Sequence, residues 1–326
     1  MRAVVIFEHG GPEVLRVSTL DEPELGAACK RVEVTHVGLN HLDVWVRRGV
    51  PGHDFHLPRV PGSDVAGTCE GQRVVLHPSW GCQRCGRCLA GEQHMCRDFA
   101  IRGESSDGGC AERVVVPDWQ LLPIPIGISS AEAASMPLAL LTAWHMLVSR
   151  ARLQAGERVL VQAGASGVGV MAIQVARMLG CDVHATASTP KKRAFLEGLG
   201  AKSWAYDAVG VRDVDVVIET VGAPTWSASM KALRWGGRLV CCGATGGASV
   251  PLDLRAVFFK QISILGSTMG SSGEMVEAWR AVIAGQIRPI VDTVMPMSRL
   301  GQAHIRLENR DVIGKIVVEQ DLLGAG

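Results

Sequence analysis

Four of the ten cysteines in this 326-residue sequence have the spacing of metal ligands. Cys82, Cys85 and Cys88 recur at every third position, and Cys96 follows in the same glycine- and arginine-containing segment. Four thiolates fill the tetrahedral coordination sphere of zinc and leave no position open for water or substrate. The spacing therefore predicts one structural zinc per chain, in a lobe at about residues 80–98. The alternative is four free thiols in a flexible loop.

A glycine-rich turn near the middle of the chain has the pattern of a dinucleotide-binding site. It reads Gly164-Ala165-Ser166-Gly167-Val168-Gly169 and joins an apolar strand to an amphipathic helix. Glycine lets the backbone approach a pyrophosphate, and the helix N-terminus offers free N–H groups. We expect Gly164, Ser166, Gly167, Val168 and Gly169 to bind the cofactor. Because Ser166 replaces the middle glycine of the usual pattern, a sharp turn without a ligand is the alternative.

The segment about twenty residues beyond this turn indicates which dinucleotide binds. An enzyme that holds the ribose of NAD places an acidic residue there, whereas this sequence reads Ala187-Ser188-Thr189-Pro190-Lys191-Lys192-Arg193. Hydroxyl groups and three cations, with no acid, suit the 2′-phosphate of NADPH. We expect Ser188 and Lys192 to contact that phosphate. The alternative is a solvated basic first turn of a helix.

The overall composition excludes other classes of protein. Hydrophobic residues make up 47% of the chain, and 33 basic residues nearly balance 32 acidic ones. A formal net charge of +1 creates no global field for nucleic acid or an anionic membrane. The apolar segments are too short for a membrane span or a signal peptide. We expect a cytoplasmic protein that acts on a small molecule.

Two patterns of secondary structure follow one another along a chain long enough for about two domains. Up to about residue 120, short β-rich runs alternate with glycine and proline, as in a mainly antiparallel domain. From about residue 128, helices alternate with compact apolar strands, the pattern that builds a parallel sheet. The expected strands are Arg2–Phe7, Arg31–Gly38, Gln72–Leu76, Ala111–Pro117, Arg158–Gln162, Asp182–Ala187, Asp215–Glu219, Arg238–Cys242, Ile262–Leu265 and Lys315–Glu319. The expected helices are Ala131–Ala151, Val168–Leu179, Pro190–Leu199, Thr225–Trp235 and one after Gly273.

Together these features resemble the medium-chain dehydrogenase/reductase superfamily over nearly the whole chain. The stretches that carry the likeness are residues 37–49, 61–67, 141–147 and 260–270. Within the superfamily the sequence is most similar to the quinone oxidoreductase-like, zinc-binding dehydrogenases. The resemblance implies an α/β fold in which a GroES-like catalytic domain (residues 1–122 and 271–326) is split around a doubly wound Rossmann domain (residues 123–270). Cofactor and substrate would bind in the cleft between the domains.

The resemblance also implies which metal the chain has kept. The four cysteines coincide with the structural-zinc lobe of the zinc-containing alcohol dehydrogenases. In those enzymes a Cys, a His and a second Cys hold a catalytic zinc, and the matching positions here are Asn40, Ser63 and Leu138. None of these residues is a usual zinc ligand. The resemblance therefore predicts the structural zinc alone.

Several cofactor and catalytic residues follow from the same resemblance. Tyr206 matches a tyrosine beside the NADP phosphate in quinone oxidoreductase-like proteins, and Gly243 and Ser267 are further expected cofactor contacts. Thr142 is expected near the nicotinamide, with a buried helical threonine as the alternative.

The segment after residue 39 is expected to supply the chemistry. Asn40 takes the place of the zinc and would donate a hydrogen bond to a developing enolate. His41 is a pyrophosphate contact, a proton donor or a structural histidine. Asp43 resembles the carboxylate behind the zinc ligands and would orient its neighbours, unless it is a solvated surface acid.

The leading hypothesis is an NADPH-dependent reductase of a carbon–carbon double bond conjugated to a carbonyl, as in quinones, enones or enoyl thioesters. A zinc-assisted alcohol dehydrogenase and a non-enzymatic, nucleotide-binding regulatory protein are the alternatives. Related proteins pair through the edge of the Rossmann sheet, here Ile262–Leu265, so we expect a homodimer or homotetramer.

Overall fold

The computed structural model describes residues 1–322 and divides into two compact units. One unit consists of Met1–Leu138 and the chain from Pro289 onward, and the other is Ala139–Arg288. The first domain is therefore interrupted by the second, as the sequence predicts. Each boundary lies farther along the chain than residues 122 and 270, where we expected it. Helix α3 (Ser130–Ala134) packs on strand β3 (Cys29–Gly38), which keeps it within the first unit.

The first unit is built on a seven-stranded sheet with the order β16-β17-β3-β4-β5-β9, in which β8 also pairs with β3. All of its pairs are antiparallel except β16 with β17. On β3 a register shift between Val34 and His36 changes which side chains are buried, from Val32 and Val34 to Val37. The strands of this unit are β1 (Arg2–Ile6), β2 (Leu15–Thr19), β3, β4 (Asp64–Cys69), β5 (Gln72–Leu76), β6 (Ser79–Trp80), β7 (Ala100–Ile101), β8 (Arg113–Pro117), β9 (Leu121–Pro123), β16 (Val291–Pro296) and β17 (Lys315–Glu319).

Short helices complete the first unit. They are α1 (His41–Arg48), α2 (Gly86–Leu89), α3 and α10 (Leu300–Glu308). Helix α1 begins directly after β3, so the chain turns from sheet to helix at Asn40. This turn places Asn40, His41 and Asp43 at the end of a central strand.

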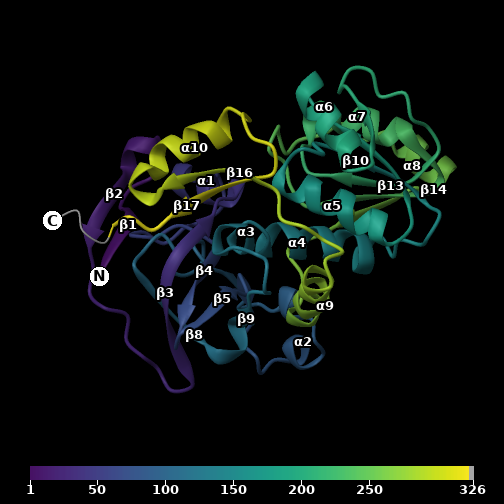
Figure 1. Ribbon diagram of the computed structural model, residues 1–326. Helices are drawn as coiled ribbons and strands as arrows, with labels where there is room; N and C mark the ends of the chain where they lie inside the picture. Colours follow the sequence, from purple (N-terminus) through teal and green to yellow (C-terminus); the bar gives the residue numbers. More distant parts are fainter. Residues whose placement is uncertain (323–326) are drawn as a thin grey trace. The chain divides into compact units, whose positions relative to one another are not determined.

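The second unit is a six-stranded parallel sheet with the order β12-β11-β10-β13-β14-β15. Its strands are β10 (Arg158–Val161), β11 (Asp182–Thr186), β12 (Lys202–Trp204), β13 (Val214–Glu219), β14 (Leu233–Cys241) and β15 (Ser263–Gly266). Its helices are α4 (Pro137–Trp144), α5 (Gly167–Met178), α6 (Pro190–Gly198), α7 (Ala223–Ala232), α8 (Leu254–Lys260) and α9 (Ser272–Ile283). Figure 1 shows α5, α6, α7 and α8 beside the strands, which they contact. The strand order reverses between β10 and β13, the point at which doubly wound folds bind dinucleotides. The predicted fold class is confirmed.

The expected helix Ala131–Ala151 is wrong as a single element. The chain forms α3, breaks, starts α4 at Pro137 and continues as a π-helix over His145–Arg150. Proline lacks the N–H that would continue a preceding helix, so it ends one helix and begins another.

The expected helix Thr225–Trp235 also extends too far. Helix α7 ends at Ala232, and β14 begins at Leu233 before the glycine pair that follows Trp235. In the second unit two elements were not predicted: β12 has only three residues, and α8 buries none of its side chains. Across residues 1–322, no helix is long and apolar enough to cross a membrane.

Candidate active site and metal centre

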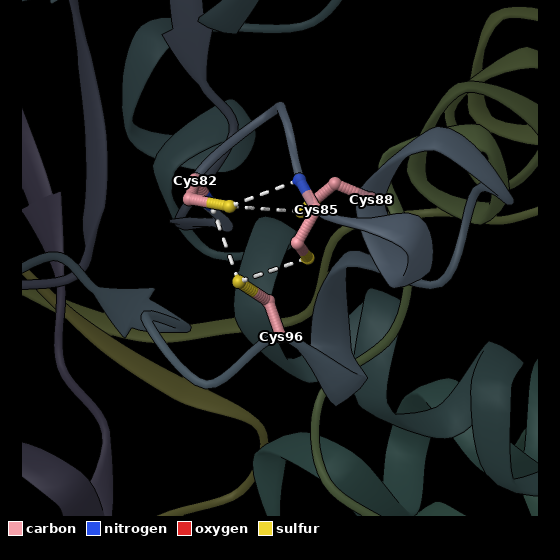
Figure 2. Close-up of side chains that lie close together, drawn as sticks. All are labelled: Cys82, Cys85, Cys88 and Cys96. Carbon is pink, nitrogen blue, oxygen red and sulfur yellow. Dashed lines mark hydrogen bonds between the residues drawn. The ribbon is translucent and has the colours of Figure 1, made fainter.

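The four predicted zinc ligands converge in the first unit (Figure 2). Their Sγ atoms all lie within 4.8 Å of one another. The sulfurs of Cys82 and Cys88 are 4.0 Å apart, and those of Cys85 and Cys96 are 3.7 Å apart. Zinc–sulfur bonds of about 2.3 Å would separate tetrahedral thiolates by about 3.8 Å. The arrangement therefore has the size of a closed zinc site, and in the described part of the chain no other cluster of three or more His, Cys, Asp or Glu side chains resembles it.

The backbone of this lobe favours a thiolate at Cys82 and allows close packing, whereas burial raises the pKa of Cys88 to about 12. N–H groups of Arg84 and Cys85 donate to Cys82 and lower its pKa to about 6. Helix α2 carries Cys88, and a Cβ added at Gly81 would lie only 2.6 Å from the Cys88 sulfur. Glycine at position 81 thus allows the chain to pass beside the ligands. The number of bound zinc ions stays a prediction.

The glycine-rich turn of the second unit lies between β10 and α5, as the sequence predicts. Ser166 is the N-cap of α5, and its Oγ accepts a hydrogen bond from the Gly169 N–H at 3.1 Å. The N–H groups of Gly167 and Val168 belong to the first helical turn, where no intrahelical acceptor exists. They point from the positive end of the helix dipole and can bind a phosphate.

Two glycines of this turn are required by close packing. A Cβ on Gly169 would lie 2.4 Å from the carbonyl oxygen of Ala163, and a Cβ on Gly164 would lie 2.8 Å from the side-chain Cβ of Ala185. Gly164 therefore lets the turn pack against β11, and Gly169 lets α5 start close above it. Ser166, which replaces the middle glycine, serves as the helix cap.

Ser188, Lys192 and Tyr206 lie at the edge where β11 and β12 end. These strands are parallel neighbours, so Ser188 after β11 and Tyr206 after β12 come to the same edge, and both are exposed. Thr189 caps α6 by accepting a hydrogen bond from the Lys192 N–H at 3.2 Å, which puts Lys192 in the first helical turn. The structure thus gathers two hydroxyl groups and a cation at this edge.

Gly243 and Ser267 lie at the corresponding edge of β14 and β15. The Ser267 N–H donates to the Cys241 carbonyl oxygen at 2.9 Å, and a Cβ on Gly243 would lie 3.1 Å from the Thr220 carbonyl oxygen. The Oγ of Ser267 is buried and has no partner among the described residues. A buried hydroxyl without a partner is costly until a ligand satisfies it. These residues fit a nucleotide cofactor.

A buried ion pair lies beside Asn40 in the first unit. The Lys315 Nζ, at the start of β17, is 2.9 Å from Asp64 Oδ2, and their side chains are 3% and 0% exposed. Lys315 also donates to Asn40 Oδ1 at 2.6 Å. Asn40 Nδ2 donates to Asp64 at 2.9 Å and, over a longer 3.4 Å, to the carbonyl oxygen of Gly38. The Leu138 N–H donates to the other Asp64 oxygen at 2.7 Å.

Asp43 holds the backbone around this cluster. Its carboxylate accepts hydrogen bonds from the N–H groups of Asn40 at 2.7 Å and Gly62 at 2.9 Å. Burial raises the pKa of Asp43 to about 6, although these two hydrogen bonds oppose the rise. The alternative of a solvated surface acid is wrong, because Asp43 is 1% exposed.

His41 is neutral at neutral pH. Burial, with the positive charges of Arg310 and Lys315, lowers its pKa to about 4. The imidazole can therefore donate an N–H hydrogen bond but adds no positive charge of its own. Its role as a pyrophosphate contact or proton donor stays a prediction.

Thr142 is buried in α4 of the second unit. Its hydroxyl donates to the sulfur of Met269 at 3.8 Å. One turn later, the buried His145 lies 2.8 Å from Glu274, which also accepts a hydrogen bond from Ser149. Burial would raise the pKa of Glu274, but the hydrogen bonds from His145 and Ser149 outweigh it and lower the pKa to about 2.

Comparison with known proteins identifies the family. Residues 29–126 match the alcohol dehydrogenase GroES-like domain, and residues 167–284 match the zinc-binding dehydrogenase family. A solved NAD-dependent alcohol dehydrogenase is 40% identical, with a TM-score of 0.94 over 98% of this chain and 99% of its own. The chain belongs to the medium-chain dehydrogenase/reductase superfamily.

The chain is similar to proteins that are named for different reductase activities. Quinone oxidoreductase from Mus musculus is 29% identical over 326 residues, covering 93% of each protein. Acryloyl-coenzyme A reductase from Sulfurisphaera tokodaii is 24% identical over 339 residues, covering 98% of this chain and 100% of its own. The chain is thus an oxidoreductase of the medium-chain dehydrogenase/reductase superfamily.

The residues at the catalytic-zinc position of the superfamily do not fit that metal. Leu138 is apolar, Ser63 offers only a hydroxyl, and the Asn40 amide is shared between Asp64 and Lys315. Zinc prefers thiolate, imidazole and carboxylate ligands. Asp64 alone is of that kind, and it is already paired with an ammonium group.

Sequence reasoning missed Asp64 and Lys315. Asp64 lies within residues 61–67, which carry the family resemblance, but its partner is 251 positions away. The available signal was a lysine directly before three consecutive apolar residues of an expected strand, Ile316, Val317 and Val318, which predicts either an edge position or a buried partner.

Proposed function

We propose that the protein is an NADPH-dependent reductase of carbon–carbon double bonds conjugated to a carbonyl group, as in quinones, enones and enoyl thioesters. The observation that carries this proposal is the buried Lys315–Asp64–Asn40 cluster at the superfamily's catalytic-zinc position. Oxidation of a plain alcohol is served by a Lewis acid, whereas conjugate reduction needs a hydrogen-bond donor at the carbonyl oxygen and a proton. The similarity to proteins named quinone oxidoreductase and acryloyl-coenzyme A reductase supports the same class of reaction.

NADPH, when bound, supplies the hydride. The N–H groups of Gly167 and Val168 would hold its pyrophosphate, in a turn shaped by Gly164, Ser166 and Gly169. The chain's contacts to the 2′-phosphate would be Ser188, Lys192 and Tyr206. Gly243 leaves space at the next sheet edge, where the buried Ser267 hydroxyl would gain a partner. Thr142 would contribute close to the nicotinamide.

Asn40 would stabilise the enolate oxygen. The Asn40 Nδ2 contact to the Gly38 carbonyl is 3.4 Å long and therefore weak, so this N–H can turn to a substrate oxygen at little cost. Lys315 holds the amide oxygen at 2.6 Å and thereby fixes the orientation of the amide, with Nδ2 on the side of Asp64 and the Gly38 carbonyl. Asp43 orients the Asn40 backbone, and the neutral His41 would donate an N–H to the pyrophosphate.

A substrate panel tests this proposal. NADPH or NADH is mixed with a quinone, an enone, an enoyl thioester or an aldehyde, and cofactor oxidation is followed at 340 nm in the absorbance band of the reduced nicotinamide. We expect oxidation of NADPH with at least one conjugated substrate and a large loss of turnover in Asn40→Ala. Unchanged turnover in Asn40→Ala would remove this residue from the mechanism. No oxidation with any substrate would favour a nucleotide-binding regulatory protein.

An alcohol dehydrogenase is the second candidate, because the solved structure that is 40% identical is named an NAD-dependent alcohol dehydrogenase. This function would require a second zinc, since four cysteines close the first site. Efficient, chelator-sensitive oxidation of benzyl alcohol, together with two zinc equivalents per chain, would establish it.

We also propose that two copies of the chain pair along β15. This strand is an edge of the parallel sheet, and its Ile264 is 38% exposed. The neighbouring helix α8 exposes Phe258 and Phe259 by 60% and 62%. An open strand edge beside exposed aromatic rings is a typical association surface.

A further inference from the structure

A row of hydrogen-bonded, buried polar side chains connects the glycine-rich turn to the neighbouring strand ends of the second unit. Gln162 follows β10, Thr186 ends β11, Glu219 ends β13, and Ser229 lies in α7. All four side chains belong to residues that are 0% exposed. Because β11, β10 and β13 are adjacent, these residues lie side by side beneath the turns that follow the strands.

The hydrogen bonds in this row all have the same donor-to-acceptor direction. The Ala163 N–H donates to Thr186 Oγ1 at 3.1 Å, and the Thr186 hydroxyl donates to Gln162 Oε1 at 2.7 Å. Gln162 Nε2 then donates to Ser229 Oγ at 2.9 Å, and the Ser229 hydroxyl donates to Glu219 Oε2 at 2.7 Å. Each side chain between the two ends accepts one hydrogen bond and donates one.

Glu219 determines that direction. Its Oε1 accepts hydrogen bonds from Val221, Gly222 and Thr225, and its Oε2 accepts one from the Ser229 hydroxyl, so Ser229 offers its lone pair to Gln162. That requirement fixes which end of the Gln162 amide faces Thr186, and the Thr186 lone pair is then left for the Ala163 N–H. Reversing any one hydroxyl would place two donors or two acceptors against each other.

At both ends of this row of hydrogen bonds, a side chain bonds to the backbone of a turn expected to contact the cofactor. Ala163 precedes Gly164 and has φ = 51°, a left-handed conformation that a non-glycine residue adopts at a cost. At the other end, Glu219 Oε1 accepts hydrogen bonds from the N–H groups of Val221 at 2.8 Å and Gly222 at 3.0 Å. The carboxylate thus fixes the turn after β13 directly and the glycine-rich turn through three side chains.

We propose that Glu219, Ser229, Gln162 and Thr186 form a positioning network that holds the glycine-rich turn in its dinucleotide-binding conformation. This inference rests on the proposed use of a nicotinamide dinucleotide. The four residues do not touch the cofactor. They act through Ala163, whose N–H and left-handed backbone set the direction in which the Gly167 and Val168 N–H groups point.

Thr186→Val tests the network, because valine keeps the shape of threonine and removes the hydroxyl. Thr186→Ser restores the hydroxyl and serves as the rescue variant. Thr35→Val is the matched control, since it removes a threonine hydroxyl that donates to the Ala66 carbonyl at 3.1 Å in the first unit. Ser229→Ala breaks the same network at a second point, in case Thr186→Val does not fold.

Two measurements follow for each variant. Nicotinamide fluorescence gives the Kd of NADPH and NADH, and hydrogen–deuterium exchange of the ligand-free protein reports on residues 163–169. We expect Thr186→Val and Ser229→Ala each to raise the Kd and the KM for the cofactor about tenfold, because one preorganising hydrogen bond is lost. At saturating cofactor, kcat should stay within about twofold, as expected when only binding is weakened. Thr186→Ser and Thr35→Val should retain the parent Kd.

Exchange separates this proposal from the proposed function. If the parent binds neither nucleotide, the proposed function fails, but faster exchange at residues 163–169 in Thr186→Val would still support the network. Parent-like exchange in that segment, or a parent-like cofactor Kd in both folded variants, would overturn the positioning role.

Discussion

Removing the positive charge of Lys315 should strongly destabilise the first unit. Lys315→Met keeps most of the aliphatic stem but leaves Asp64 as a buried carboxylate without its cation. Loss of one partner from a buried ion pair costs about 3–5 kcal/mol, and the 3% and 0% exposed side chains place this pair in that class. The backbone N–H of Leu138 and the side-chain amide of Asn40 still donate to Asp64, at 2.7 and 2.9 Å. We therefore expect Lys315→Met to lower the free energy of unfolding by about 3 kcal/mol, the lower end of that range.

A double-mutant cycle isolates the interaction between the two charges. Asp64→Asn alone leaves a buried ammonium, whereas Lys315→Met with Asp64→Asn removes both charges. The double variant should be less destabilised than the sum of the single variants by about 2 kcal/mol or more. The exposed pair Lys30–Glu70 is the matched control: its side chains are 36% and 69% exposed, so Lys30→Met should cost less than about 1 kcal/mol.

The assay is hydrogen exchange of β17 and β3 under increasing urea, which gives a local free energy of unfolding for the first unit. Additivity of the two single variants within about 0.5 kcal/mol would refute a coupled buried pair. Equal losses in Lys315→Met and Lys30→Met would refute it as well.

Three further predictions concern other parts of the molecule. Cys96→Ser should lose bound zinc as measured by elemental analysis, because zinc needs all four thiolates to close its site; full zinc retention would contradict the ligand set. Lys192→Ala should raise the Kd of NADPH about tenfold and leave that of NADH unchanged, since one charged contact to the 2′-phosphate is lost; an equal effect on both nucleotides would place Lys192 elsewhere. Glu274, with its pKa lowered to about 2, stabilises the fold fully above the unfolded value of 4.5 and loses this contribution as pH falls toward 2. In thermal unfolding from pH 7 to pH 3, Glu274→Gln should therefore be less stable than the parent at pH 7 and approach it in acid, and a pH-independent difference would argue against the His145–Glu274 contact.

The sequence predicts those parts of the site whose residues are close together along the chain. The zinc ligands lie within fifteen positions of one another, and ligand chemistry requires them to converge. The glycine-rich turn is equally local, because strand, turn and helix follow in order. The expected strands Gln72–Leu76 and Lys315–Glu319 have the same bounds in the structure.

The remaining features depend on contacts between distant residues. The Lys315–Asp64 pair joins the last strand to β4, and Glu219 reaches the glycine-rich turn through Ser229 in α7, Gln162 after β10 and Thr186 at the end of β11. The apolar stretch around Pro137 reads as one long helix because hydrophobicity continues across the break. Short elements such as β12 carry too few residues for a periodic pattern.

The central claim is that this oxidoreductase reduces conjugated double bonds with NADPH and does not oxidise simple alcohols through a catalytic zinc. The most direct measurement compares kcat/KM for an enone with NADPH against kcat/KM for benzyl alcohol with NAD or NADP, each with and without a zinc chelator. We expect measurable enone reduction that prefers NADPH and survives brief chelation, with essentially no alcohol oxidation. Efficient benzyl alcohol oxidation that the chelator abolishes would contradict it.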